Sequence, residues 1–192
     1  ISSRAVANIT AQVQLEGTTA NASAISIVRN AASQYPPYLN FGKSRATSTG
    51  GTTIVNNNDS LGEIRFSGSD GNDLTNHAAS INAEVDGTPG NNVTPGRLIF
   101  STTSSTGSDA VERLRITSSG IIQISQSAPQ LQLKDSDGTN QLVQFMQSGG
   151  ATYLDLRDNT SDGELIIRGK GGDTATERLR IASDGQIKQT AA

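Results

Sequence analysis

The stretch Glu-Arg-Leu-Arg-Ile-Thr-Ser-Ser-Gly at residues 112–120 recurs as Glu-Arg-Leu-Arg-Ile-Ala-Ser-Asp-Gly at residues 177–185. In an extended strand, successive side chains point to opposite faces, so the leucine and last isoleucine would share one face. The Ser-Ser-Gly and Ser-Asp-Gly tripeptides are turn sequences, in which glycine can supply a positive φ angle. Each copy therefore predicts a β-strand that ends in a tight turn.

After the first turn the chain returns through Ile-Ile-Gln-Ile at residues 121–124. Alternation predicts a strand here, with Ile122 and Ile124 pointing inward. The second copy returns through Gln-Ile-Lys-Gln at residues 186–189, which is much less apolar. We expect this last strand to be frayed or to continue into a part of the polypeptide beyond this sequence.

Short alternating runs separated by Gly, Asn, Asp and Ser occupy most of the remaining chain, whereas helical periodicity is nearly absent. This pattern predicts an all-β fold of short antiparallel strands and turns. The first stretch, residues 6–15, fits a helix or a strand, and its Val, Ile and Thr content favours a strand. The other predicted strands are residues 24–29, 38–43, 62–67, 80–86 and 97–101.

Further similarities extend the repeat upstream of the shared motif. Gly-Arg-Leu-Ile-Phe at residues 96–100 matches Gly-Glu-Leu-Ile-Ile at residues 163–167, and residues 24–29 resemble residues 130–135. Internal repeats are typical of architectures that stack similar units. We predict a connecting segment at residues 1–19, a first β-module at 20–125 with an insertion at about 44–94, and a second β-module at 126–192.

The composition sets limits on how this chain is stabilised. Of its 192 residues, 33% are hydrophobic and 4% aromatic, and none is cysteine. Soluble domains are commonly about 45–50% apolar when glycine is counted, so a lone chain would bury a thin core. Disulfides cannot supply the difference, and neighbouring subunits are the obvious source. The small net charge of -3 and the ordered alternation argue against a disordered chain.

The same composition excludes several partners and processing signals. No basic patch favours nucleic acid, and no apolar run is long enough for a transmembrane helix, so we expect no membrane insertion. The chain begins at Ile1 with no signal-peptide pattern, and it ends at Ala192. We expect a fragment or processed piece of a longer polypeptide.

The sequence contains few candidates for a metal site. His77 is the single histidine, and only Asp70 and Asp73 lie near it, so we interpret it as a surface residue in a loop. Residues 135–140 resemble a calcium loop, but glycine stands at the fourth position rather than the sixth and no glutamate follows at the twelfth. We interpret this stretch, like residues 69–73, as a β-turn, and we expect no metal and no cofactor.

An acidic cluster and an aromatic loop are the remaining candidates. Paired carboxylates could serve a glycoside hydrolase, but sequence alone does not give their spatial separation, and acidic residues are expected beside turns. Tyr35 and Tyr38 flank two prolines and could stack on a sugar or another protein, although we favour packing on a neighbouring strand. We expect no catalytic residues and no enzyme. The acidic residues are Asp155, Asp158, Asp162 and Glu164; the Asn-x-Ser/Thr triplets, which we regard as accidental, begin at Asn8, Asn21, Asn58, Asn92 and Asn159.

The two arginines of the repeated motif could bind an anion. Alternation places Arg113 and Arg115 together, on the face opposite Leu114 and Ile116. Arginine and glutamate on adjacent strands commonly form ion pairs, within a chain or between subunits. We favour such pairs, which would fix the register between chains, over a ligand site.

The motif, with its turn and the following Ile-Ile-Gln-Ile, resembles the recurring motif of tailed-bacteriophage tail-fibre and related virion fibre proteins. Gly-Glu-Ile-Arg-Phe at residues 62–66 also resembles a strand of such fibres, and the similarity covers about residues 24–187. The family implies homotrimers with interwoven β-strands, as a β-sandwich, β-prism or triple β-helix. One end would bind other virion tail or baseplate proteins, and the other a host cell-surface glycan or protein.

The sequence departs from the family pattern after Ile187, where the Gly-Ile-Gly-Thr continuation that often precedes a C-terminal chaperone domain is missing. This departure favours a part of the fibre other than its tip. We therefore expect a non-enzymatic structural segment of a virion fibre, with Leu114, Ile116, Leu179 and Ile181 completing a core shared between subunits. The alternatives are a receptor-binding or glycan-degrading tailspike and a bacterial surface adhesin.

Overall fold

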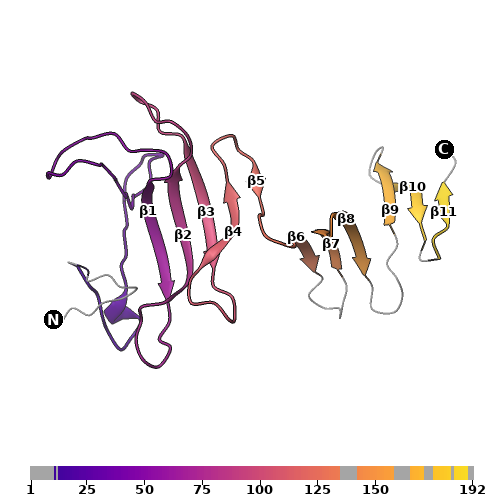
Figure 1. Cartoon of the computed structure of the whole chain (residues 1–192), viewed down its shortest axis with the longest axis horizontal. Coiled ribbons are helices and arrows are strands. Elements are labelled where there is room, and N and C mark those ends of the chain that lie inside the picture. The colour runs from indigo at the N-terminus through magenta and orange to yellow at the C-terminus, as the bar shows by residue number, and fades with distance from the viewer. Residues whose placement is uncertain are drawn as a thin grey trace. The chain divides into compact units, whose positions relative to one another are not determined.

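The computed structural model describes residues 11, 13–134, 142–157, 165–170, 175–182 and 184–189. The described residues form eleven β-strands and a single turn of 3-10 helix, η1 (Asn21–Ser23) (Figure 1). All neighbouring strands run antiparallel. The prediction of an all-β fold built from short antiparallel strands is confirmed. No helix among the described residues has the length and apolar character needed to cross a membrane.

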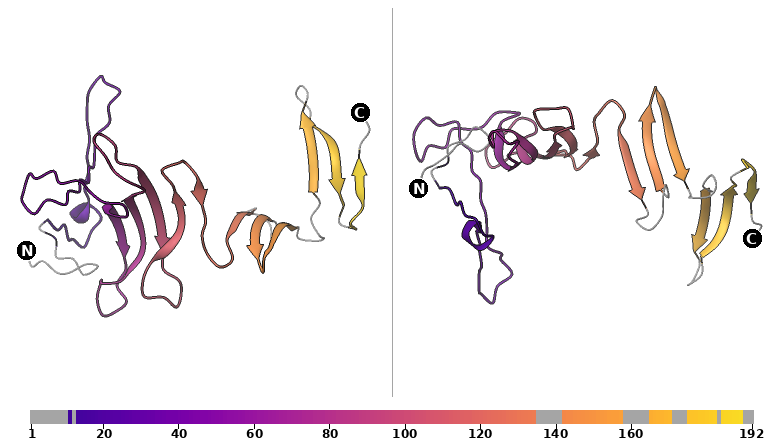
Figure 2. Two further views of the ribbon diagram at one scale, coloured as in Figure 1. Left: turned by 45° about the horizontal axis from the view of Figure 1, so that its top comes forward. Right: turned by 90° about the horizontal axis from the view of Figure 1, so that it is seen from below.

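The chain divides into two compact units, residues 1–125 and residues 126–192. The first unit contains one five-stranded sheet, in which each strand pairs with the next along the chain (Figure 2). Its strands are β1 (Ser60–Ser67), β2 (His77–Val85), β3 (Gly96–Thr102), β4 (Val111–Ile116) and β5 (Ile122–Gln123). Four predicted strands correspond to β1, β2, β3 and β4, while the predicted insertion supplies β1 and β2.

The second unit contains two three-stranded sheets. One consists of β6 (Gln130–Lys134), β7 (Leu142–Ser148) and β8 (Ala151–Arg157), paired in that order. The other consists of β9 (Leu165–Lys170), β10 (Ala175–Ile181) and β11 (Ile187–Gln189), again paired in sequence order. The stretch at residues 186–189, which has few apolar residues, therefore does contain a strand, β11.

The register of the sheets shows how closely the repeated motif is reproduced in the backbone. Leu114 pairs with Phe100 and Ile116 with Leu98, just as Leu179 pairs with Ile167 and Ile181 with Leu165. Both pairings contain a shift of one residue, at Arg113 in the first copy and at Arg178 in the second. Such an extra residue on one strand is a β-bulge. The two copies therefore share register and bulge position as well as sequence.

The turns that follow the two motifs are also equivalent. Thr117 donates its N–H to the carbonyl of Ile121 at 3.0 Å, and Ala182 donates to the carbonyl of Gln186 at 2.9 Å. Gly120 closes the first turn with a φ of 81° and Gly185 the second with a φ of 78°. These angles lie in the left-handed region that favours glycine, so the prediction that glycine permits the turn is confirmed.

The hydrophobic core within the described residues is small. The buried apolar side chains are Val55, Val85, Ile99 and Ala182. Within each unit, the described strands make their extensive contacts with their own sheet neighbours, so each sheet is a single layer of strands. Neither unit contains, in its described residues, two sheets packed face to face. The expected thin core follows from this single-layer arrangement.

Three local predictions are wrong for the described chain. Residues 24–29 and 38–43 alternate as strands should, yet both are irregular and exposed, because no neighbouring strand pairs with them. The strand expected at residues 121–124 is reduced to β5, and Ile122 is 68% exposed rather than inward, because nothing covers its face. Most of residues 6–15 lies outside the described residues.

Candidate assembly surface

One face of the five-stranded sheet is apolar and open. Paired residues in neighbouring antiparallel strands point to the same side, so the register assigns each side chain to a face. Ile64 pairs with Ile81, which pairs with Phe100, which pairs with Leu114. We call this side the open face. Its most exposed members are Ile64 (42%), Phe66 (52%), Val111 (52%), Ile116 (37%) and Ile122 (68%).

The opposite side of the same sheet is polar and closed, and we call it the closed face. Ile99, at its centre, pairs with Asn82 and Arg115, and is only 7% exposed. Arginine and glutamate stems can cover apolar surface while their charged ends remain in water. Three Arg–Glu pairs lie on this face and help to cover it. They join Glu63 to Arg65, Glu84 to Arg97, and Glu112 to Arg115.

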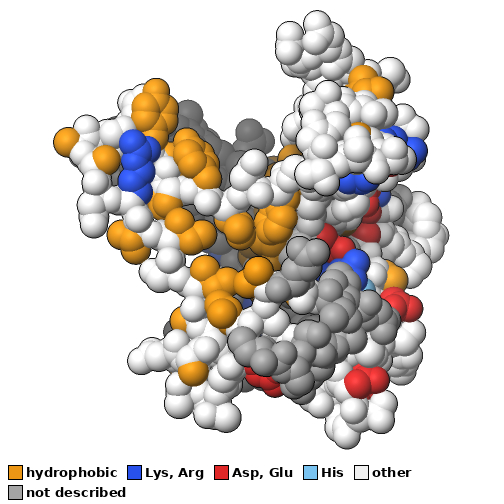
Figure 3. Space-filling model, turned by 90° about the vertical axis from the view of Figure 1, so that its left-hand side faces the viewer, with side chains coloured by type: hydrophobic (Ala, Val, Ile, Leu, Met, Phe, Trp, Pro, Cys, Tyr) orange, Lys and Arg blue, Asp and Glu red, His pale blue; other side chains and the backbone are white. Residues whose placement is uncertain are grey.

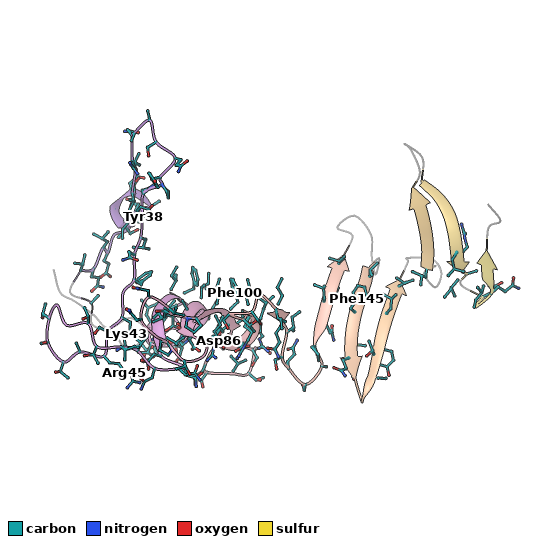
Figure 4. All side chains as sticks on the ribbon, turned by 90° about the horizontal axis from the view of Figure 1, so that it is seen from above. Tyr38, Lys43, Arg45, Asp86, Phe100 and Phe145 are labelled. Atoms are coloured by element: carbon teal, nitrogen blue, oxygen red, sulfur yellow. The ribbon has the colours of Figure 1, made fainter. Side chains whose placement is uncertain are left out.

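The most enclosed of these pairs connects β2 and β3. The guanidinium of Arg97 donates from Nε to Glu84 at 2.9 Å, and also to Asp86 at 3.2 Å and to the Asn58 side chain at 2.9 Å. Its side chain is 13% exposed. Asp86 in turn accepts the backbone N–H of Ser118 at 2.8 Å, which ties the first motif turn to the end of β2. Figure 4 places Asp86 and Phe100 on opposite sides of the sheet.

The bulge explains how Glu112 and Arg115 come to share a face. In a regular strand, residues three apart point to opposite sides. Because Arg113 is the extra residue of the bulge, Glu112 faces the same side as Arg115, and Arg115 Nε donates to Glu112 at 2.6 Å.

A cross-strand partner for Arg115 is not found in the described chain, because its pair lies within β4. The alternative of an ion pair between subunits stays a prediction. The predicted grouping of the two arginines is wrong. Arg113 donates from Nε to the hydroxyl of Thr102 at 3.0 Å, and Thr102 pairs on the open side with Val111. The bulge interrupts the alternation on which the prediction depended.

Hydrogen bonds to the closed-face carboxylates favour their charged forms. The hydrogen bond from the Arg115 side chain lowers the pKa of Glu112 below its ordinary value. The same hydrogen bond raises the pKa of Arg115. The backbone N–H of Ser118 is the main cause of a lowered pKa at Asp86, to which Arg97 adds. These groups are therefore charged at neutral pH, as the ion pairs require.

The sheet of β6, β7 and β8 has the same two-sided character. Leu131 pairs with Phe145, which pairs with Leu154, and these three side chains are 52%, 51% and 44% exposed. On the other side, Gln144 is 5% exposed and accepts a hydrogen bond from the Gln132 amide at 2.8 Å. Here too the apolar side is open. The other side has the buried, hydrogen-bonded Gln144 at its centre, while Gln132 and Tyr153 on that side are exposed.

In the third sheet, the described side chains of the motif are less enclosed than a monomeric core requires. Ile181 is 38% exposed and Leu179 is half-buried. The core shared between subunits, which we predicted from Leu114, Ile116, Leu179 and Ile181, stays a prediction.

In the space-filling view of Figure 3, hydrophobic side chains gather on one side, while most acidic and basic side chains lie on the other.

A shallow polar pocket lies at the loop end of the five-stranded sheet. It is lined by Asp70, Asn76, His77 and small residues of the loops after β1 and β3, with a volume of about 420 Å³. His77 is half-buried and begins β2, so its assignment to a loop is wrong. Among the described residues, no three His, Cys, Asp or Glu side chains are grouped to hold a metal ion.

The carboxylates near this pocket are already occupied by turn hydrogen bonds. Asp70 accepts the backbone N–H groups of Asn72 and Asp73 at 2.9 and 3.0 Å, which lower its pKa. Asp73 accepts the N–H and hydroxyl of Thr75. The turn interpretation of residues 69–73 is confirmed.

Some of the other sequence candidates are described by the structure, and some lie outside the described residues. Tyr35 and Tyr38 are 61% and 68% exposed, so their predicted packing on a strand is wrong within this chain. Asn58 and Asn92 occupy exposed positions with positive φ angles. The calcium-like stretch at residues 135–140, and Asp158, Asp162 and Glu164, lie outside the described residues, and only the backbone of Asp155 is placed, in β8.

Comparison with known proteins finds similarity among solved structures only. No protein-family model matches the chain, and no curated protein sequence matches it. Among solved structures, the chain is similar to the carboxy-terminal domain of the bacteriophage T5 L-shaped tail fibre, at 10% sequence identity and a TM-score of 0.43. The match covers 88% of this chain and 91% of that one. A TM-score below 0.5 sets no constraint on how this chain folds or functions.

Proposed function

We propose that this chain is a structural segment of a bacteriophage virion fibre, most simply a tail fibre, and that it works as a homotrimer. The observation that carries the proposal is the open apolar face, which recurs on separate sheets. Exposed apolar patches of this kind usually mark interaction sites. A second copy offers the same apolar surface, and self-association through matching patches is the common route to symmetric oligomers.

The similarity of the repeated motif to virion fibre proteins supports the same assignment. Both copies of the motif form a strand, a bulge and a turn. In the first copy Glu112 and Arg115 form an ion pair, and Arg113 donates to the hydroxyl of Thr102. Among the described residues, the charged side chains of the first motif therefore have partners within their own sheet. The role we propose is therefore to build and extend the fibre and to support host-cell attachment, with its contacts made to other copies and to tail or baseplate proteins.

Light scattering coupled to size-exclusion chromatography tests the assembly. At micromolar concentration we expect a particle of three chains, and a folded monomer of about 20 kDa would contradict the trimer. Antibodies against the chain, viewed on intact virions by electron microscopy, test the location. Labelling along an external fibre would support the proposal, whereas labelling confined to a bacterial cell surface would favour an adhesin.

A further inference from the structure

The segment of residues 24–41, which we call the arm, has the pattern of strands without their pairing. Ile25 and Ile27 alternate with Ser26, and Leu39 and Phe41 alternate with Asn40. Its described hydrogen bonds are local, such as that from the Arg29 guanidinium to the carbonyl of Tyr35 at 3.1 Å. A strand pattern that finds no partner among the described residues of its own chain is suited to one in another chain.

The arm also exposes many large apolar side chains. Seven large side chains are between 48% and 76% exposed, which amounts to on the order of 1,000 Å², comparable with the roughly 800 Å² that each partner contributes to a standard interface. These residues are Ile25, Ile27, Val28, Tyr35, Tyr38, Leu39 and Phe41.

The arm leaves its own sheet from the open face. A Cβ placed on Gly62 would lie 2.5 Å from the Cβ of Phe41, so Phe41 sits directly over Gly62. Gly62 pairs with Ala83 on the open side, next to the uncovered Ile64 and Phe66. Beyond Phe41 the arm, with Tyr38, projects from the sheet (Figure 4). The arm thus covers the first position of the open face in its own chain and departs before reaching the rest.

We propose that the arm of one copy docks on the open face of a second copy, beside the position that the second copy's own Phe41 occupies. The two surfaces match in character, because both are apolar and, apart from the contact of Phe41 with Gly62, neither is covered by the described residues of one chain. Docking would continue across the sheet the contact that Phe41 begins at Gly62. This inference rests on the proposed function only in requiring that copies assemble.

Disulfide trapping tests the docking directly, since the chain has no cysteine of its own. Full-length Ile27→Cys and Phe66→Cys variants, carrying tags of different size, are refolded together and oxidised. We expect a covalent dimer containing both tags. The matched control replaces Phe66→Cys by Arg65→Cys, the next residue of β1, which lies on the closed face, and should give at least tenfold less of that dimer.

A chain carrying both Ile27→Cys and Phe66→Cys, refolded with an excess of cysteine-free chain, identifies the alternative. An internal disulfide in that chain would mean that the arm folds onto its own sheet, and would overturn the inference. Failure to form the mixed dimer, in material that light scattering shows to be assembled, would also overturn it while leaving the fibre proposal intact. A monomeric wild-type chain would overturn both.

An independent variant checks the arm without cross-linking. Ile25→Asp with Ile27→Asp should raise the concentration needed for assembly by tenfold or more. Val13→Asp, an 81% exposed position outside the arm, should leave it unchanged. Equal effects of the two substitutions would contradict docking through the arm.

Discussion

The two faces of the five-stranded sheet come from the same strands but are completed in different ways. On the closed face, Ile99 is covered, and arginine and glutamate side chains pair across it. On the open face, Phe66 and Ile122 keep more than half of their surface exposed. The polar face is thus covered within one chain, while the apolar face remains exposed. The difference teaches that, among the described residues, a single chain pairs its charges locally but leaves apolar surface exposed, which the proposed assembly would bury.

The largest effect should follow from charging the open face. Ile64→Asp with Phe66→Asp would place two carboxylates in a surface that the proposed trimer buries, where unpaired charges are strongly unfavourable. We expect assembly to be lost at micromolar concentration, as measured by light scattering. In the matched closed-face variant, Glu63→Gln with Arg65→Gln, assembly should be retained. Loss of assembly in both variants would mean that the faces do not differ in this respect.

A smaller effect should follow from changing the turn that orients β5 and therefore sets which face Ile122 presents. Gly120 has a φ of 81°, a conformation that costs other residues about 1–2 kcal/mol. Gly120→Ala should lower the free energy of unfolding by that amount, measured by chemical denaturation. Gly68→Ala, where φ is not positive and no atom lies within 4 Å of the added Cβ, provides the control. Equal losses in the two variants would contradict this account of the turn.

Removing one charge from the closed face should cost less. Glu112→Gln keeps the shape of the side chain but removes the ion pair with Arg115, a partly exposed pair for which a loss of about 1 kcal/mol or less is expected. Thermal unfolding followed by circular dichroism would measure it. The oligomeric state should not change, because this pair is completed within one strand; dissociation would show that the closed face also contributes to assembly.

Acid should weaken the closed face by the same route. The folded-state pKa values of Glu112 and Asp86 are lowered, so their stabilising contribution is fully present above the ordinary carboxyl pKa of about 4 and is lost as pH falls through the folded values. The melting temperature of the wild type should therefore fall below about pH 4. Glu112→Gln should show a shallower fall, and parallel curves for the two proteins would contradict a role for Glu112.

The sequence predicted the strands of the five-stranded sheet well, because alternation and turn residues act locally. Residues 62–67 and 97–101 lie in β1 and β3, and Gly120 adopts the positive φ that the turn needs. Residues 24–29 show the limit of such a pattern: it states that a segment can pair but does not supply the partner. The same applies to Ile122, whose apolar character predicted an inward position that no second layer provides.

The candidate surface was predictable only in part. The Arg-Glu content of the motif indicated ion pairs, but strict alternation placed Arg113 with Arg115 and gave Arg115 a partner on another strand. The bulge at Arg113 changed both, and an inserted residue leaves no clear mark in a single copy of the motif. The closed centre around Ile99 was also missed, because its cover consists of charged side chains that a sequence pattern assigns to solvent.

The self-contained pairing within each sheet has a consequence for the gene. Because strands β9 to β11 repeat the register of the first motif and, among the described residues, pair only with one another, this meander shares no strand with another sheet. An in-frame duplication or deletion of such a block would change the number of sheets without disturbing those that remain. Length could then be altered in whole blocks that keep the strand pairing of the remaining sheets.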